Sequence, residues 1–436
     1  MPRRSTDSKF LSPVCAIFLI VCALASFASA QQAKPAPGKA AAALSPQNAE
    51  LLAAAGREKP KVIETLRDLV AMETGSGLGP GLAQSAAYLQ KRLESLGFTV
   101  KIVPLTKGVG SNVVGTIEGA GRVSIMLLAH QDTVYPAGTV ARKPFRIEGN
   151  RVYGPGVADE KGGIANVLHS LALLRQAGFK DYKRITVLFN ADEEVSSPGS
   201  AELITRTAAE HDYVFSCEPA GAEQDGLILA TSGIGAVVLD VTGRAAHAGV
   251  EPEAGRNALY ELSHQVLQAS NLSQPATGLK LNWTVATAGD KRNIIPERAQ
   301  ATADVRVWKN SQYDEIEQAM TKLTAKHLIP DVTVKYVLER RRPAFEAKPE
   351  AFRLAELATR IYAEAGQKLV YSPKPWGGGT DAAFAALSGK PVVLESLGLV
   401  GYGFHSSSDE YVDLNSIQPR LYLLSRLIME VSRAKR

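Results

Sequence analysis

Amphipathic helical segments and short apolar strands alternate along most of this chain, and this alternation constrains its fold more than any other feature. Residues 62–72 and 82–96 repeat apolar side chains at helical spacing, while residues 99–103, 123–128 and 185–189 are short β-branched or apolar runs. Helices and strands that alternate in sequence are typical of an α/β layer. The pattern therefore predicts an α/β fold with a mostly parallel central sheet.

A second unit interrupts this alternation between residues 232 and 342. Its order of elements suits a small α+β sandwich with helices on one face. The expected elements are strands at 236–242, 279–286, 299–307 and 332–338 and helices at 257–269 and 314–327. After Arg342 the α/β pattern resumes. The small unit is therefore expected to be inserted into a larger domain formed by residues 47–231 and 343–436.

Residues 1–30 have the plan of a secretory signal peptide. Basic side chains precede an apolar run at 14–27 and the small residues Ala28, Ser29 and Ala30. The run is shorter than the roughly 20 residues of a spanning helix, which favours cleavage over retention as an anchor. Residues 31–46 are expected to be a flexible leader. The protein is thus predicted to be exported, periplasmic or secreted, without stable membrane insertion after processing.

The charge distribution and the cysteine content argue against a nucleic-acid-binding protein and against a fold held together by disulfides. The formal net charge is +5 at pH 7, but basic and acidic residues are interspersed, so no nucleic-acid partner is expected. A chain of 436 residues that is 45% apolar can bury substantial cores and is expected to hold two domains. Cleavage of the signal peptide would leave Cys217 as the single cysteine. Stability would then depend on the cores and not on disulfides.

Several expected strands end in acidic or imidazole side chains. These are His130, Gln131 and Asp132 after the run at 125–129, Asp192, Glu193 and Glu194 after the run at 185–189, and Cys217 and Glu218 after a third run at 213–216. The carboxyl ends of parallel strands open onto one crevice, where α/β sheets place their sites. Asp159 in a glycine-rich segment and His405 near the C-terminus extend the set. Two imidazoles and three carboxylates suit zinc, cobalt or manganese, and would hold two ions if one carboxylate bridged them.

Seven short strings resemble, in this order, the co-catalytic zinc exopeptidase family of aminoacylases, desuccinylases and glutamate carboxypeptidases. They are HQDTV from residue 130, GPGVADEKGG from 154, FNADEE from 189, CEP from 217, HAG from 247, NIIP from 293 and GGGTD from 377. The resemblance extends from residue 47 to the C-terminus, in particular to bacterial folate-hydrolysing glutamate carboxypeptidases. It implies a phosphorylase/hydrolase-like catalytic domain and an inserted ferredoxin-like dimerisation (lid) domain in a homodimer.

The resemblance also implies the metal site. His130 and Glu218 would bind one zinc ion, Glu194 and His405 the other, and Asp159 would bridge the two. Two Zn²⁺ per subunit are therefore expected, with Co²⁺ or Mn²⁺ as substitutes. The family further has a cis peptide bond after the bridging aspartate.

Catalytic positions are carried over from the same motifs. Asp132 would orient the imidazole of His130, as carboxylates near metal ligands commonly do. Glu193 would be the general base. His247 would reach the other subunit's site and stabilise the oxyanion of the tetrahedral intermediate.

Substrate contacts are expected from Asn293, Arg306, Arg342 and Gly379. A guanidinium such as that of Arg306 can bind a terminal carboxylate with two hydrogen bonds. The implied substrate is therefore a small molecule or peptide with a free carboxylate.

The implied activity is that of a metallocarboxypeptidase, which hydrolyses the amide bond to a C-terminal amino acid, above all glutamate, of folate-like, N-acyl or peptidyl substrates. Two departures leave the substrate open. Residues 219–226 contain no cation where folate-cleaving relatives have a lysine, and Trp376 replaces a smaller residue. An aminoacylase or dipeptidase of the same family is the alternative, and a non-catalytic metal-dependent binding protein is a remote one.

Overall fold

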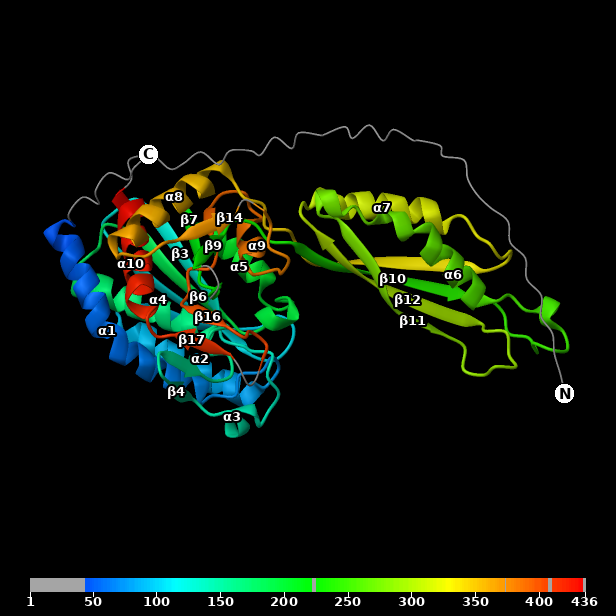
Figure 1. The fold of residues 1–436 in the computed structure, drawn as a ribbon, viewed down its shortest axis with the longest axis horizontal. Helices are drawn as coiled ribbons and strands as arrows, with labels where there is room; N and C mark the ends of the chain where they lie inside the picture. The colour runs from blue at the N-terminus through cyan, green and yellow to red at the C-terminus, as the bar shows by residue number, and fades with distance from the viewer. Residues whose placement is uncertain (1–43, 222–224, 373, 407–409, 434–436) are drawn as a thin grey trace, which may run out of the picture. The chain divides into compact units, whose positions relative to one another are not determined.

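A computed structural model describes residues 44–436, except for 222–224, 373, 407–409 and 434–436 (Figure 1). The predicted signal peptide lies outside the described residues, as does the predicted leader up to residue 43. Among the described residues, no helix is long and apolar enough to cross a membrane.

Helix α1 (Pro46–Val70) starts much earlier than the helix predicted at 62–72. The side chain of Ser45 caps it by accepting a hydrogen bond from the backbone N–H of Asn48 (3.2 Å). Pro60 lies inside the helix, although proline usually ends one. The segment predicted at 62–72 therefore corresponds to the C-terminal part of α1, and the helix begins at Pro46, where the leader was predicted to end.

The central sheet has six strands in the order β1-β2-β6-β3-β7-β15. They are β1 (Thr99–Pro104), β2 (Ser111–Glu118), β3 (Ser124–His130), β6 (Arg184–Asn190), β7 (Tyr213–Ser216) and β15 (Val392–Leu394). Strands β6, β3, β7 and β15 pair in parallel, while β1 and β2 form an antiparallel edge. The predicted α/β fold with a mostly parallel sheet is confirmed.

Helices cover both faces of this sheet. The first core contains side chains of α1, α2 (Gly79–Ser95), α4 (Lys161–Gln176), α8 (Pro349–Glu364) and α10 (Ile417–Arg433), and the second those of α5 (Ala201–Ala208) and α9 (Ala382–Ala386). Along β3, Ile125 and Leu127 belong to the first core and Met126 and Leu128 to the second. This alternation buries the strand on both faces, as in other parallel sheets.

A second sheet of five short strands connects segments near the carboxyl end of the central sheet. Its order is β4 (Arg146–Glu148), β5 (Arg151–Tyr153), β17 (Tyr411–Asp413), β16 (Val400–Tyr402) and β8 (Ala220–Gly221). Helix α3 (Thr139–Arg142) precedes it, and β14 (Val370–Ser372) pairs separately with β9 (Gly226–Ile228). Because β5 ends just before Gly154 and β16 and β17 flank His405, this sheet brings distant site segments together.

Residues 233–342 form the four-stranded antiparallel sheet of the inserted unit. Its elements are β10 (Gly233–Thr242), α6 (Ala258–Gln268), β11 (Lys280–Ala288), β12 (Arg298–Val307), α7 (Ser311–Thr324) and β13 (Thr333–Arg342). The strand order β11-β12-β10-β13, with both helices packed on the sheet, is the ferredoxin-like βαββαβ arrangement (Figure 1). Alternate residues of β12 face the helices, among them Ala301, Ala303 and Val305.

His211, buried against the central sheet, makes the stability of the fold depend on pH. Its Nδ1 lies 2.7 Å from the carbonyl oxygen of Thr207 and its Nε2 lies 2.8 Å from the hydroxyl of Thr186. Burial lowers the pKa of His211 from 6.5 to about 4. Between these values the unfolded chain binds more protons than the folded protein, so the free energy of unfolding falls as the pH is lowered.

We expect the wild type to lose about 2 kcal/mol more stability than His211→Gln between pH 7 and pH 5. Urea denaturation of both proteins at the two pH values measures this difference. Equal losses of unfolding free energy in the two proteins would contradict the lowered pKa of His211.

Candidate metal site

The candidate site lies where the parallel strands of the central sheet end. His130 is the last residue of β3, and Glu218 follows β7. Beyond the end of β6, the short 3₁₀ helix η1 (Glu193–Val195) carries Glu193 and Glu194. These strands are neighbours, so their carboxyl ends place the side chains around one crevice.

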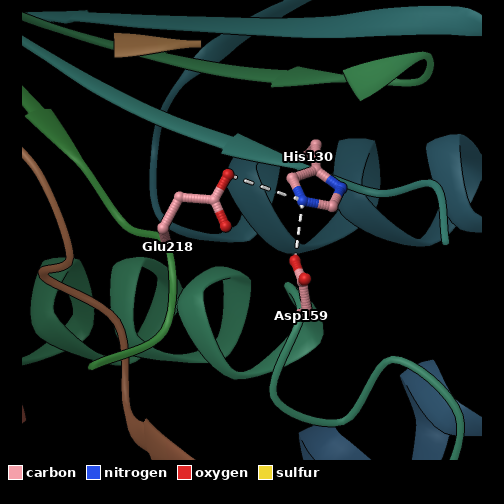
Figure 2. Close-up of side chains that lie close together, drawn as sticks. All are labelled: His130, Asp159 and Glu218. Atoms are coloured by element: carbon pink, nitrogen blue, oxygen red, sulfur yellow. Dashed lines mark hydrogen bonds and ion pairs between the residues drawn. The ribbon is translucent and has the colours of Figure 1, made fainter. Parts of the chain in front are cut away.

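The first cluster consists of His130, Asp159 and Glu218. Nε2 of His130 lies 3.1 Å from Oδ1 of Asp159 and 3.7 Å from Oε1 of Glu218. Figure 2 shows that both carboxylates face the same ring nitrogen of His130. One ligand atom from each residue lies within 4.8 Å of the others, a spacing at which the three could hold one ion.

The second cluster consists of Asp159, Glu194 and His405. Nε2 of His405 lies 3.4 Å from Oδ2 of Asp159 and 3.3 Å from Oε2 of Glu194. Asp159 therefore belongs to both clusters and turns a different oxygen toward each. The peptide bond between Asp159 and Glu160 is cis, as the resemblance implied. The His405 side chain is 58% exposed and that of His130 only 1%, so the second cluster is the one open to solvent.

The acidic groups of the site fit divalent cations. Burial and the charge of Asp159 raise the pKa of Glu218 well above its usual range. Glu160 is 1% exposed, and its Oε1 has no hydrogen-bond partner among the described residues. Burial alone would lower the pKa of His130, but its contacts with Asp132 and Asp159 raise it well above the usual value. The buried carboxylates thus lack enough positive charge nearby to balance them. A donor set of imidazole and carboxylate groups suits zinc and similar ions.

Asp132 is 0% exposed and holds the first cluster in place. Its Oδ1 lies 3.4 Å from Nδ1 of His130 and accepts a hydrogen bond from the backbone N–H of Glu193 (3.0 Å). Its Oδ2 accepts from the backbone N–H of Glu194 (3.2 Å) and the hydroxyl of Ser76 (2.7 Å). Nδ1 of His130 lies closer still to the backbone carbonyl oxygen of Asp132 (3.0 Å), so Asp132 orients the His130 ring through its backbone as well as through the carboxylate that holds η1.

Glu193 belongs to neither cluster and instead pairs with Arg342. Nη1 of Arg342 contacts Oε1 of Glu193, and Nη2 donates to the Glu193 carbonyl oxygen at 2.7 Å. Nη1 also lies 3.3 Å from Oδ1 of Asp381, which accepts from Ser197 (2.5 Å). Burial raises the pKa of Glu193 above its usual range, while Arg342 opposes this shift. Arg342 is only 2% exposed, and both terminal nitrogens are engaged by protein groups.

The family model of peptidase family M20/M25/M40 matches residues 126–430. The chain belongs to this family. Carboxypeptidase G2 from Pseudomonas sp. (strain RS-16) is 47% identical over 388 residues, which cover 88% of this chain and 92% of that protein. Acetylornithine deacetylase from Proteus mirabilis (strain HI4320) is 25% identical and covers 85% of this chain and 96% of its own.

A solved structure has the same fold at lower identity. Aminopeptidase PepT from Bacillus cereus ATCC 10987 aligns with a TM-score of 0.73 at 20% identity, covering 86% of this chain and 99% of its own. The predicted resemblance to the exopeptidase family and the predicted fold with a catalytic and a lid domain are therefore confirmed.

A cavity of about 550 Å³ in this M20/M25/M40 peptidase opens onto both clusters. Its wall includes Arg306, Arg342 and Gly379 of the predicted substrate-binding residues. Apolar side chains line it as well, among them Leu227, Ile228, Tyr371, Trp376 and Phe404. Such a mixture of apolar wall and few polar groups is typical of small-molecule sites.

Arg306 is partly exposed, and its guanidinium is paired with Asp304 on the same strand. The Nε–Oδ2 distance is 3.0 Å and the Nη2–Oδ1 distance is 3.2 Å. His247 and Asn293 lie elsewhere in the inserted unit, where both are exposed, and neither lines this cavity. A hydrogen bond from the backbone N–H of Ala248 to the carbonyl oxygen of Asn293 (2.9 Å) joins their two segments. The structure thus brings the five predicted ligands and Glu193 together but leaves these two apart from them.

Proposed function

We propose that this M20/M25/M40 peptidase is a metal-dependent carboxypeptidase that releases a C-terminal amino acid, above all glutamate, from folate-like, N-acyl or peptidyl substrates. The observation that carries the proposal is the pair of clusters that share Asp159, with Glu193 beside them and a cavity that also contains Arg306. The 47% identity to Carboxypeptidase G2 supports the same activity.

The cofactor we propose is a pair of Zn²⁺ ions, for which Co²⁺ or Mn²⁺ can substitute. His130 and Glu218 would hold one ion, Glu194 and His405 the other, and Asp159 would bridge them, in keeping with the two clusters of neighbouring side chains. When bound, such a pair lowers the pKa of a water molecule and polarises the scissile carbonyl.

The chain's own groups would then move the proton and hold the geometry. Glu193 would take the proton of the attacking water on its carboxylate and pass it to the nitrogen of the leaving amine. Asp132 would keep the His130 ring in orientation through the Nδ1 contact. A homodimer would bring His247 of one subunit to the oxyanion in the other, a role that suits its exposed position away from its own cavity.

The substrate carboxylate would pair with Arg306, which would exchange Asp304 for the ligand. Gly379 would line the same end of the cavity, and Asn293 would contact substrate from the inserted unit. Arg342 would lie near the substrate and act through its contact with Glu193. Both of its terminal nitrogens already have protein partners. Export through the N-terminal signal peptide, to the periplasm or the medium, completes the proposal.

An aminoacylase or dipeptidase is the second candidate, because the loop at 219–226 has no cation and an acetylornithine deacetylase is 25% identical over most of the chain. Release of glutamate from folate, N-acyl-glutamate and dipeptides by the zinc-loaded protein separates the candidates. The first proposal requires the highest kcat/KM with substrates from which glutamate departs. A preference for N-acetyl amino acids or dipeptides that do not end in glutamate, with no release of glutamate from folate, would reject it.

Arg306→Ala is expected to lower kcat/KM for substrates with a terminal carboxylate by about 10- to 100-fold, because it removes a hydrogen bond to a charged group. The loss should appear mainly in KM, since Arg306 lies apart from the reacting atoms. Arg340→Ala is the matched control: Arg340 also pairs with acidic side chains of the inserted unit, those of Asp314 and Glu317 (both 2.7 Å), and does not line the cavity. An unchanged KM in Arg306→Ala would refute the assignment of this residue.

A further inference from the structure

One buried carboxylate, that of Glu410, contacts the loop that carries Asp159. Glu410 is 2% exposed. Its Oε1 accepts hydrogen bonds from the backbone N–H groups of Ala158 (2.9 Å) and Asp159 (3.0 Å), and its Oε2 accepts from that of Gly156 (2.9 Å). Three amides of one short loop therefore point at a single carboxylate.

Two further contacts of Glu410 reach the segments that carry the imidazoles. The hydroxyl of Tyr135 donates to Oε2 of Glu410, and Tyr135 lies in the segment that leaves His130 at the end of β3. The backbone N–H of Glu410 donates to the carbonyl oxygen of Ser406 (3.2 Å), the residue after His405. One residue thus joins the segments of His130, Asp159 and His405.

The loop is shaped for this contact. Gly156 has φ +69°, in the left-handed region, and a Cβ there would come within 2.4 Å of the Thr133 side chain. On the carbonyl side, Nζ of Lys161, itself 2% exposed, donates to the Pro155 oxygen at 2.9 Å. The amides of the loop therefore face a buried carboxylate and one of its carbonyls faces a buried ammonium.

Glu410 is not placed to bind a metal ion itself. Its two oxygens are occupied by four donors, it belongs to neither cluster, and it does not line the cavity. We propose that Glu410 is a positioning residue that fixes the Asp159 loop against the His130 and His405 segments, so that the ligands converge before a cation binds. This inference rests on the proposed metal-dependent function. Groups that orient metal ligands act on the affinity for the ion.

The test is metal affinity in Glu410→Gln. The amide keeps the shape of the side chain but turns an NH₂ group toward one set of backbone donors, so part of the loop loses its acceptor. We expect the stripped variant to bind Zn²⁺ about 10- to 100-fold more weakly than the wild type, measured by competition with a chelator of known affinity. The visible absorption of the Co²⁺-loaded variant should also change, since it reports the arrangement of the ligands.

Glu261→Gln is the matched control. Glu261 is 0% exposed and its Oε2 accepts backbone N–H bonds from Leu328 (2.8 Å) and Ile329 (2.7 Å), but it lies in the inserted unit. It should lose thermal stability while its zinc affinity and cobalt spectrum stay those of the wild type. Should Glu410→Gln not fold, Tyr135→Phe, which removes a single donor to the carboxylate, is expected to weaken zinc binding several-fold.

A folded Glu410→Gln with wild-type zinc affinity and an unchanged cobalt spectrum would overturn the proposal, as would the same result for Tyr135→Phe if it alone folds. The measurement needs no substrate. A wild type that binds the cations but releases no amino acid would therefore reject the proposed function and leave the role of Glu410 standing.

Discussion

Glu193→Gln is expected to lower kcat by about 10²- to 10⁴-fold, the range that a general base contributes. Glutamine has nearly the same shape as glutamate but cannot accept the proton of the attacking water at neutral pH. Both proposed metal ions should remain bound, because Glu193 belongs to neither cluster. Steady-state kinetics together with elemental analysis of the same sample measure the two quantities. A fully metal-loaded variant with near-normal turnover would exclude Glu193 as the base.

The loss of the Glu193 charge also leaves the buried Arg342 with fewer partners, and a separate variant controls for this. Asp381→Asn weakens the same guanidinium cluster, because Oδ1 of Asp381 lies 3.3 Å from Nη1 of Arg342. It leaves the carboxylate of Glu193 in place. We expect Asp381→Asn to reduce thermal stability while kcat falls by less than about tenfold, since no proton-transferring group is removed. A loss as large as that of Glu193→Gln would mean that the arginine cluster, and not the base, sets the rate.

Much of the fold could be predicted because long elements have a clear period. Every second residue of β12 is buried over ten positions, and so is every second residue of β10, in which Ala236 is buried as well; both strands were predicted. Strand β2 was not, because Gly115 interrupts its apolar residues and its buried positions do not alternate regularly. The strands of the five-stranded sheet have two or three residues each, too few for any period to be detected.

Convergence of the ligands could be predicted because it follows from the ends of parallel strands and from the family motifs. His130 and Glu218 follow neighbouring strands, so their meeting needs only the strand order. The role of Glu410 could not be predicted. An acid in a polar segment is usually solvated, and its contact with Gly156, 254 residues away in the chain, depends on the pairing of β17 with β5.

The pairing of Glu193 with Arg342 was equally hidden from the sequence. Arg340, Arg341 and Arg342 form one basic run; the family resemblance singled out Arg342 as a substrate contact, but nothing in the run showed that Arg342 would be buried or would pair with Glu193. In the structure Arg340 pairs with surface acids, whereas Arg342 is 2% exposed and contacts Glu193, the proposed base. Strand β13 ends at Arg342, where the chain returns to the larger domain, and this position brings Arg342 into the site and not its two neighbours.

Removal of the metal ions by a chelator is expected to abolish turnover, and Zn²⁺, Co²⁺ or Mn²⁺ should restore it. Stripping should also change how stability depends on pH. In the stripped protein burial and Asp159 raise the pKa of Glu218 well above 4.5, and contacts with Asp159 and Glu194 raise the pKa of His405 from 6.5 to about 10. Asp159 itself shifts downward, but this affects stability only below pH 3.8.

Both raised groups keep protons in the folded state that the unfolded chain releases, Glu218 above pH 4.5 and His405 above pH 6.5. The free energy of unfolding of the stripped protein should therefore fall as the pH rises through neutrality. Bound cations replace these protons and bind more tightly as the pH rises, so the loaded protein does not share the loss of stability of the stripped one. The Tm difference between the two forms should widen from pH 6 to pH 8 in calorimetry. His211 titrates in both forms and cancels from the difference, so a gap that stays constant or narrows would show that cations and protons do not compete for these side chains.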